Sequence, residues 1–509
     1  MSTRPAAKKV HPFWLQNKST LPELSSIASM LKIDLKWGVK PVEEPYIIIE
    51  MDNESDALKL MSHTMLVRSC YELWGEGNTE SELHSSVQSC PSELINPHIA
   101  VDKSFKIRVE TFNKKLKNNE RLKKIESFSY IPFEGPVNLT NADTHLQLIE
   151  YYGLHPNIIP ENPLKLFFGR WIMDGQRELI NRFSVKNRCY IGNTSMDAQL
   201  SFIMCNFAQI QPGSIVVDPF VGTGSVLVAA AEKGAHVWGG DIDFLTLHAK
   251  TRPSRYLQKE RNEKESIFGN LEQYNLSHKY LDVVVMDSAR PFWRNIPFID
   301  AIVTDPPYGI RESTERVGTH KEQNKGSLSP SPSLDSDNIS NETDLNMPSQ
   351  QNSPEDLLHF PTKINYCLSD IFRDLLEFAA RHLRIGGRLV FWLPIFREDY
   401  TPDQVPSHPC LKQIDNCEQA LTMHSSRRLI TLQKNRHLKE GEHATAKVVD
   451  VMAEFRDKFF QASLISKEER MKKKNFLITD KRGQGLGYRL NEPTKKERKK
   501  LKKSETQLL

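Results

Sequence analysis

The chain has 509 residues, which is too long for one compact core, so we expect two or three domains. No apolar run is long enough to span a bilayer, and no secretory signal follows the basic N-terminus, so a cytoplasmic protein without membrane contact is expected. The seven cysteines are scattered without a CxxC pair, which indicates free thiols and neither a zinc site nor a disulfide framework.

The net charge of +4 is unevenly distributed along the chain. The segment from Lys467 to Glu505 holds 15 Lys/Arg and 6 Asp/Glu, a net +9, whereas Ser313–Leu358 holds 3 basic and 8 acidic residues, a net −5. Subtracting both from +4 leaves a body near neutrality. This excludes a uniformly basic nucleic-acid-binding protein, so any RNA binding would require a patch, a tail or a partner.

Residues 1–155 have the pattern of an α+β domain. Apolar residues recur at helical spacing from Leu21 to Leu31, Tyr46–Ile49 indicates a strand, and Ser104–Phe112 alternates as a half-exposed strand does. Three prolines then mark a linker over residues 156–165.

From residue 166 to 460 strands and helices alternate, which predicts a doubly wound, mostly parallel α/β sheet. A helix is expected over 195–207, and strands are expected at 214–218, 236–241, 281–287, 301–305 and 389–393. The Ser/Pro/Asn/Asp-rich segment 313–358 is expected to be a disordered insertion in this domain, and residues 461–509 a basic disordered tail.

A strand, a tight turn and a helix start meet in Val216–Leu227, where Gly222 and Gly224 let the backbone pass close to a ligand. A dinucleotide pyrophosphate is disfavoured because Leu227 replaces the third glycine of that motif. Asp218 also ends the strand, and a carboxylate there favours a cationic ligand. The loop therefore predicts S-adenosylmethionine, with a purely structural turn as the alternative.

Two further acids end the next two strands. Asp241 is placed to accept hydrogen bonds from ribose hydroxyls, and Asp287 from an adenine amino group. Phe220 and Ile242, each beside one of these acidic strand ends, complete the expected cofactor-binding set in the loops.

A fourth acid opens the segment Asp305-Pro306-Pro307-Tyr308, which follows a predicted strand. Two prolines remove both N–H donors, so the Asp305 carboxylate and the Pro306 carbonyl form an acceptor-only edge. Such an edge suits an exocyclic amine, because accepting its hydrogens directs the nitrogen lone pair toward a methyl donor. Tyr308 can stack on the base. These four residues are the predicted catalytic set.

Several motifs together resemble the family of eukaryotic tRNA (guanine-10-N2) methyltransferase catalytic subunits. The resemblance runs from about Leu21 to Phe460 and is carried by Phe168–Ile172, Asp174–Ile180, Ile191–Asp197, Asp218–Gly224, Gly240–Asp243, Thr304–Ser313 and Ser426–Thr431. It implies an N-terminal THUMP-type RNA-binding module and a class I methyltransferase domain with a Rossmann-like, mostly parallel seven-stranded sheet. It also implies tRNA as substrate, Thr194 near the methionine end of the cofactor, and a small zinc-binding activator subunit.

Other readings stay open at this point. A DNA or protein amide-nitrogen methyltransferase would share the acceptor motif, and a non-catalytic RNA-binding subunit would share the first module. An NAD-dependent oxidoreductase fits less well because it leaves Asp305–Tyr308 unexplained. In the usual class I strand order the third strand is outermost, so the strand Tyr280–Met286, apolar on both faces, is expected at the sheet edge. The activator implied by the resemblance would add a strand there.

Overall fold

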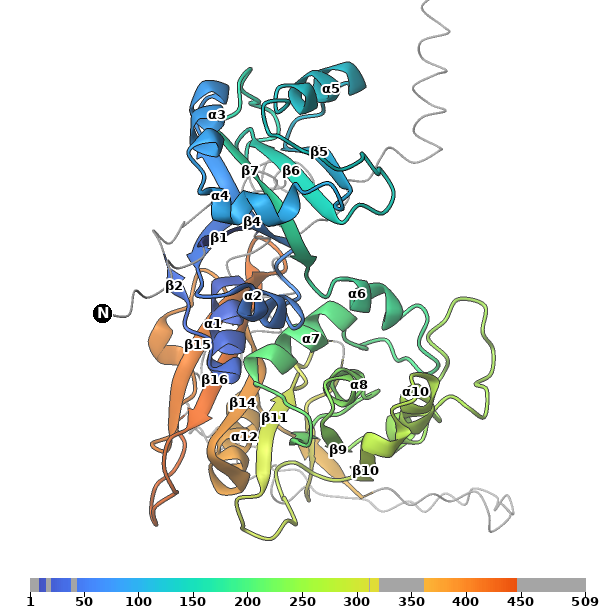
Figure 1. Cartoon of the computed structure of the whole chain (residues 1–509). Helices are drawn as coiled ribbons and strands as arrows, with labels where there is room; N and C mark the ends of the chain where they lie inside the picture. Colours follow the sequence, from blue (N-terminus) through green and yellow to red (C-terminus); the bar gives the residue numbers. More distant parts are fainter. Residues whose placement is uncertain (1–8, 15–19, 38–43, 311, 320–360, 446–509) are drawn as a thin grey trace, which may run out of the picture. The chain divides into compact units, whose positions relative to one another are not determined.

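The computed structural model describes residues 9–14, 20–37, 44–310, 312–319 and 361–445 (Figure 1). The chain forms two compact units, each with its own seven-stranded sheet. The first unit contains the described residues up to Ser184 together with Ala198–Gln209, and the second contains Val185–Asp197 and the described residues from Ile210. The predicted fold classes, α+β followed by α/β, are confirmed.

The sheet of the first unit has the order β2-β3-β1-β4-β7-β6-β5, and its pairs are antiparallel except for β5 with β6. Its strands are β1 (Lys9–Trp14), β2 (Lys36–Trp37), β3 (Tyr46–Glu50), β4 (Ser69–Gly77), β5 (Phe105–Phe112), β6 (Thr144–Tyr151) and β7 (Lys165–Asp174). Its helices are α1 (Thr20–Leu31), α2 (Glu54–Met61), α3 (Glu80–Gln88), α4 (Ser92–Ile95), α5 (Asn118–Glu126), α6 (Glu178–Arg182) and α7 (Ala198–Phe207).

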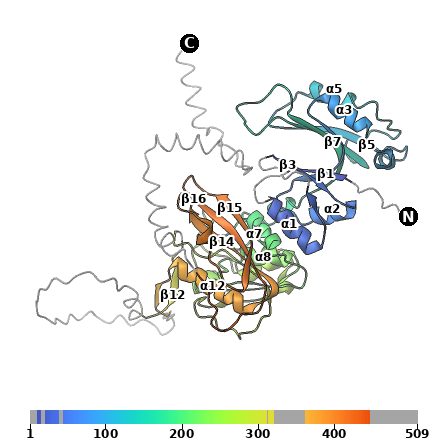
Figure 2. The same ribbon diagram turned by 90° about the vertical axis from the view of Figure 1, so that its left-hand side faces the viewer.

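Local sequence explains where several of these helices begin. The side chain of Asn53 accepts a hydrogen bond from the Asp56 N–H at the start of α2, and Thr79 does the same for the Glu82 N–H at the start of α3. Leu83 and Val87 of α3 then pack against buried Trp74 of β4. Figure 2 shows α3 and α5 on the same side of the sheet.

A buried carboxylate ties α1 to the rest of the first unit. Glu23 of α1 is fully buried and accepts hydrogen bonds from the Thr64 hydroxyl, the Met65 and Leu66 N–H groups and the Asn206 amide, at 2.6–3.0 Å. Asn206 lies on α7. Burial raises the pKa of Glu23, and these donors oppose the rise.

The expected domain boundary needs correction. Residues 156–165 were predicted to be a linker and residue 166 the start of the second domain, but β7 lies between β4 and β6 in the first sheet. Helix α7, expected in the second domain, also packs on α1: the Ser26 hydroxyl donates to the Asn206 carbonyl at 2.8 Å. A proline-rich loop between two paired strands has the same composition as an interdomain linker, so sequence alone did not separate the two.

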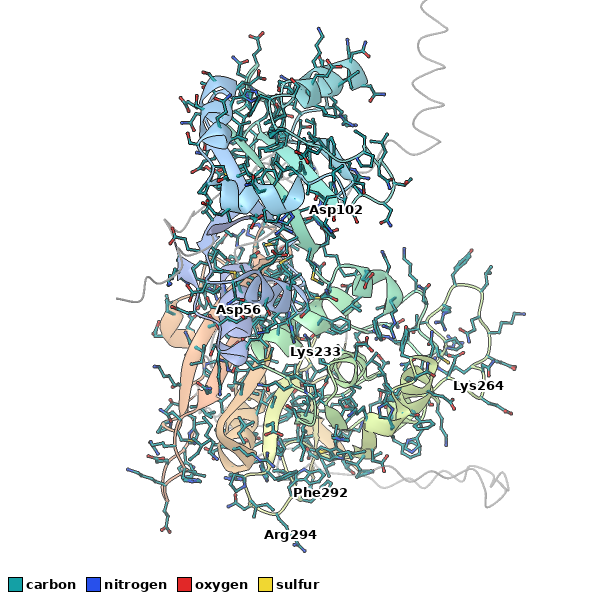
Figure 3. The ribbon with its side chains drawn as sticks, in the orientation of Figure 1. Asp56, Asp102, Lys233, Lys264, Phe292 and Arg294 are labelled. Carbon is teal, nitrogen blue, oxygen red and sulfur yellow. The ribbon has the colours of Figure 1, made fainter. Side chains whose placement is uncertain are left out.

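The sheet of the second unit has the order β10-β9-β8-β11-β14-β16-β15. The first five strands are parallel, and β16 and β15 are antiparallel to their neighbours. Its strands are β8 (Ile215–Asp218), β9 (His236–Asp241), β10 (Tyr280–Val285), β11 (Ile299–Thr304), β14 (Leu383–Phe396), β15 (Leu411–Ala420) and β16 (Ser425–Lys434). Its helices are α8 (Ser225–Glu232), α9 (Phe244–Leu247), α10 (Ile267–Gln273) and α12 (Leu368–His382). Lys233, labelled in Figure 3, directly follows α8.

The predicted insertion 313–358 does not begin as an unstructured segment. Residues Glu315–Val317 form β12, which pairs with β13 (Lys363–Asn365). This pairing joins residues far apart in sequence, so the local composition did not reveal it. The rest of the insertion, residues 320–358, and the predicted tail over 461–509 lie outside the described residues.

All seven cysteines are free thiols. Within the described part of the chain, no helix has the length and apolar character needed to cross a membrane. The predicted edge position of the third parallel strand is confirmed, since β10 is outermost in the second sheet and, of the strands that the structure describes, pairs with β9 alone.

Replacing Glu23 with Ala is expected to destabilise the first unit by at least about 3 kcal/mol, because several buried donors would lose their acceptor. The measurement is the urea-unfolding midpoint of the full chain. Glu93→Ala, which removes an exposed carboxylate from α4 of the same unit, serves as the control and should leave the midpoint unchanged. Equal midpoints for both variants would contradict a stabilising role for Glu23.

Candidate active site

Four acidic residues lie at the carboxyl ends of four neighbouring parallel strands. Asp241 ends β9 and Asp218 ends β8, whereas Asp287 and Asp305 follow β10 and β11. Because the strand order is β10-β9-β8-β11, all four meet at one edge of the sheet. The structure thus brings together the predicted cofactor acids and the predicted catalytic acid.

Asp218, at the end of β8, forms a hydrogen bond to the last residue of the neighbouring strand β11. It is only 2 % exposed, and its Oδ1 accepts from the Thr304 hydroxyl at 2.6 Å and from the Phe220 N–H at 3.1 Å. Thr304 is the last residue of β11, immediately before Asp305. Burial raises the pKa of Asp218 to about 7, although both hydrogen bonds oppose the rise.

Asp241 shapes the glycine loop. Its Oδ2 accepts from the Gly222 N–H at 2.8 Å, and its Oδ1 accepts from the Asp243 N–H at 3.0 Å. Gly222 and Gly224 have φ values of +50° and +77°, in the left-handed region that side chains rarely adopt. A Cβ at Gly222 would meet nothing within 4 Å, so the loop passes open space there.

Asp218 is buried and Asp241 half-buried, and neither carboxyl group has a cation beside it among the described residues. Every hydrogen-bond donor recorded for the two carboxylates is a neutral N–H or hydroxyl. In the described ranges of the chain, no Lys or Arg side chain forms an ion pair with either of them. Burial also raises the pKa of Asp241, to about 6. A cationic ligand would supply the positive charge that balances the ionised carboxylates of Asp218 and Asp241.

Asp305 has the opposite environment. Its Oδ2 lies 3.3 Å from the Arg427 guanidinium, which stacks over the Trp392 ring at 4.2 Å, and its Oδ1 accepts from the Tyr308 hydroxyl. The carboxyl is 27 % exposed. Desolvation raises its pKa, while Arg427 and the Tyr308 hydroxyl favour the ionised form.

The remaining predicted residues occupy the loops around this edge. Asp287 accepts from the Ala289 and Val317 N–H groups at 2.9 Å each, so it also holds β12. Phe220 lines a small cavity with Pro219, Met286, Ser288, Leu375 and Phe378. Ile242 directly follows Asp241 in the same loop, and both Pro306 and Pro307 precede Tyr308 in the turn after β11.

Thr194 lies in a turn that precedes α7. The predicted helix at Ser195 begins instead at Ala198, because the Ser195 hydroxyl accepts from the Gly192 N–H at 2.8 Å and bonds the Thr223 hydroxyl at 2.6 Å. Thr194 is exposed, and its hydroxyl donates to Glu312 in the loop after Tyr308. This turn therefore contacts both the glycine loop and the acceptor loop.

Sequence reasoning missed four residues that support the site. Thr304 donates to Asp218, and Arg427 pairs with Asp305. The buried Asn270 amide contacts the Tyr190 and Thr223 carbonyls at 2.9 and 3.4 Å, and Arg188 donates to the Ser225 hydroxyl at 2.7 Å. Thr304 and Arg427 lie within the motifs 304–313 and 426–431, so their place in motifs shared with the family was the available signal.

Comparison with known proteins agrees with both units. The Tmrp11 THUMP N-terminal domain matches residues 15–177, and the RMKL-like methyltransferase domain matches residues 186–321. The tRNA (guanine(10)-N(2))-methyltransferase TRMT11 of Xenopus laevis is 45 % identical over 86 % of this chain and 88 % of its own length. The TRMT11 protein of Homo sapiens is 44 % identical over 84 % of this chain and 89 % of its own length.

A more distant relative extends the similarity. The tRNA (guanine(10)-N(2))-methyltransferase of Saccharomyces cerevisiae is 32 % identical over 81 % of this chain and 89 % of its own length. The matches cover the THUMP module, the glycine loop and the acceptor loop. This chain therefore belongs to the tRNA (guanine(10)-N(2))-methyltransferase family, with a THUMP N-terminal domain followed by a class I methyltransferase domain.

Proposed function

We propose that this chain transfers a methyl group from S-adenosylmethionine to the exocyclic N2 of guanosine 10 in tRNA, as the catalytic subunit of a two-subunit enzyme. The observation that carries the proposal is the hydrogen bond from Thr304 to Asp218. This bond joins Thr304, which precedes the acceptor motif, to Asp218, which precedes the glycine loop. The expected cofactor-binding half-site around Asp218 and the expected acceptor half-site around Asp305 therefore share one edge of the sheet. Family membership supports the substrate.

The cofactor half-site fits S-adenosylmethionine by charge and by space. When bound, this cofactor supplies an electrophilic methyl group on a positively charged sulfur. Asp218 would attract its cationic methionine end, Asp241 would accept from its ribose, and Asp287 would accept from its adenine. The open space beside Gly222 admits a ligand against the backbone. Thr194, Phe220, Gly224 and Ile242 would line the same site.

The acceptor half-site fits a neutral amine. Asp305 accepts one N–H of the guanine amine and the Pro306 carbonyl accepts the other, while Pro307 leaves no competing backbone donor. Arg427 opposes the rise in the pKa of Asp305 that desolvation causes, and its guanidinium, 3.3 Å away, orients the carboxylate. Tyr308 would stack on the guanine. Holding the amine in line with the methyl group supplies much of the rate.

Replacing Asp305 with Ala is expected to lower kcat by roughly 10²–10⁴-fold, the usual contribution of a positioned catalytic group. Affinity for S-adenosylmethionine should stay within a few-fold, because Asp218 and Asp241 face the cofactor. Methyl transfer to tRNA and calorimetric cofactor binding are the two measurements. The exposed Glu272→Ala variant is the matched control, and near-normal activity of Asp305→Ala would remove this role.

Cofactor affinity is expected to depend on pH through Asp218, whose pKa is raised to about 7. The ionised carboxylate attracts the cationic cofactor, so lowering the pH from about 8 to about 6 should weaken binding by roughly tenfold. Asp218→Asn should bind weakly at every pH and lack this dependence. Constant wild-type affinity over the range, measured by calorimetry, would rule out the assignment.

The activator subunit is proposed to dock on β10. Among the described strands this edge strand pairs only with β9, and its Leu281 and Val285 side chains are 54 % and 47 % exposed. An edge strand invites another strand through its outer N–H and C=O groups. The exposed Asp282 carboxylate accepts from the Val283 N–H at 2.8 Å and would have to release it if that group is to pair with the partner. A small zinc-binding protein adding one strand there would cover both side chains.

Val285→Lys is expected to abolish co-purification of the activator, since the partner's strand would bury a charge. Cofactor binding by the remaining chain should persist. Ile385→Lys, which places the same charge on β14 at a similarly exposed apolar position, should leave the complex intact. If Val285→Lys still co-purifies stoichiometrically and methylates tRNA normally, the docking surface is elsewhere.

A further inference from the structure

The basic loop, residues 251–264, is the segment of the methyltransferase domain that joins α9 to α10. In Figure 1 it is the yellow-green loop leading into α10, and Lys264 at its end is labelled in Figure 3. Its tip carries Tyr256 and Leu257, which are 92 % and 84 % exposed. No other large apolar side chain in the described residues is as exposed as these two. Packing within the domain does not account for their position.

The backbone at the tip is also unusual. Leu257 has a φ of +69°, in the left-handed region that residues other than glycine seldom adopt. Because its side chain contacts solvent, no burial within the domain offsets this conformation. The loop thus presents two adjacent apolar side chains outward at the expense of local stability, which is typical of residues that contact a partner.

The base of the basic loop is held firmly. Arg261 pairs with Glu265 at 2.8 Å, and both side chains are less than 10 % exposed. The Arg261 guanidinium also donates to the Thr251 and Arg252 carbonyls at 2.7 and 2.9 Å, and it lies over the Tyr190 ring at 4.8 Å. These bonds close the loop at its two ends. The tip therefore projects from a base that these hydrogen bonds hold in place.

The basic loop carries uncompensated positive charge. It contains five basic and two acidic residues. Arg255 donates to the Arg188 and Cys189 carbonyls, which are neutral and leave its charge in place. Arg252 and Lys259 are exposed, and no carboxylate among the described residues pairs with them. An exposed aromatic ring flanked by unpaired cations matches nucleic acid, which offers base faces and phosphates together.

The basic loop is hydrogen-bonded to the segment from residue 188 to residue 197, which contacts the candidate active site. Arg255 and Arg261 bind the carbonyls of residues 188, 189 and 191, and this segment continues into Thr194. Thr194 in turn contacts Glu312 in the loop after Tyr308. An RNA bound at the tip would therefore lie against a segment that continues to the acceptor loop.

We propose that the basic loop is an RNA contact within the methyltransferase domain itself, separate from the THUMP domain. Tyr256 stacks on a nucleobase or ribose of the substrate tRNA beside the target guanosine, Leu257 packs along it, and Arg252 and Lys259 contact phosphates. The inference rests on the proposed tRNA methylation, because it takes tRNA as the ligand.

The experiment uses the full chain co-purified with its activator and an unmodified tRNA transcript. Tyr256→Ala should raise the Kd for tRNA by roughly five- to a hundredfold, the effect of losing one stacked base. Tyr256→Phe keeps the ring and should bind normally. Cofactor affinity, measured by calorimetry, should be unchanged in both variants, because neither residue faces the cofactor acids.

A second pair of variants tests the charges. The double variant Arg252→Gln with Lys259→Gln should weaken tRNA binding and flatten its salt dependence, because fewer counterions are released. Lys412→Gln with Lys439→Gln, two exposed lysines of the same domain, is the control and should leave both unchanged.

Two outcomes would overturn the inference. One is a tRNA Kd within twofold of wild type for both Tyr256→Ala and the double variant. The other is loss of the activator from the complex, which would make the loop a protein-docking surface. Failure of the proposed function is distinguishable, since then the wild-type complex itself would not methylate the transcript.

Discussion

The placement of the Asp218 and Asp241 carboxyl groups inside the domain, with neutral hydrogen-bond donors around them, is the constraint on which the rest of the methyltransferase domain depends. Ionised carboxylates inside a protein are costly unless donors or cations surround them. Here the donors are two backbone N–H groups from the glycine loop, one from the loop after β9, and one hydroxyl from the neighbouring strand. The left-handed turn at Gly222 brings its N–H to Asp241, so the shape of the loop and the position of the charge depend on each other.

The two half-sites differ in how their charge is balanced, and the difference matches their ligands. Asp305 has its own cation, Arg427, whose guanidinium lies over the Trp392 ring. A neutral amine can approach this acid without adding an unbalanced charge. Among the described residues Asp218 and Asp241 have no such partner, so in the proposed function the balancing positive charge would come with the ligand. A cationic methyl donor and a neutral acceptor would then be bound by acids in opposite environments.

The segment from Arg188 to Asp197 connects the parts of the domain that face different ligands. It is held by Asn270 on one side and by Thr223 of the glycine loop on the other. The same segment carries the basic loop through carbonyl contacts and meets the acceptor loop through Glu312. This segment thus contacts the glycine loop, the acceptor loop and the basic loop through hydrogen bonds of its backbone and its side chains.

Local sequence patterns were enough to identify the residues that end the strands and the chemistry they carry, because strand periodicity, glycine turns and acidic or proline residues are read from neighbouring positions. Asp218, Asp241, Asp287 and Asp305 were all identified in this way, whereas the edge position of β10 was expected from the usual class I strand order. Contacts between distant residues had to come from the folded chain: that β7 belongs to the first sheet, that Glu315–Val317 forms a strand, and that Arg427 lies against Asp305. Pairing and burial depend on where the chain folds back on itself, and local composition carries no record of that.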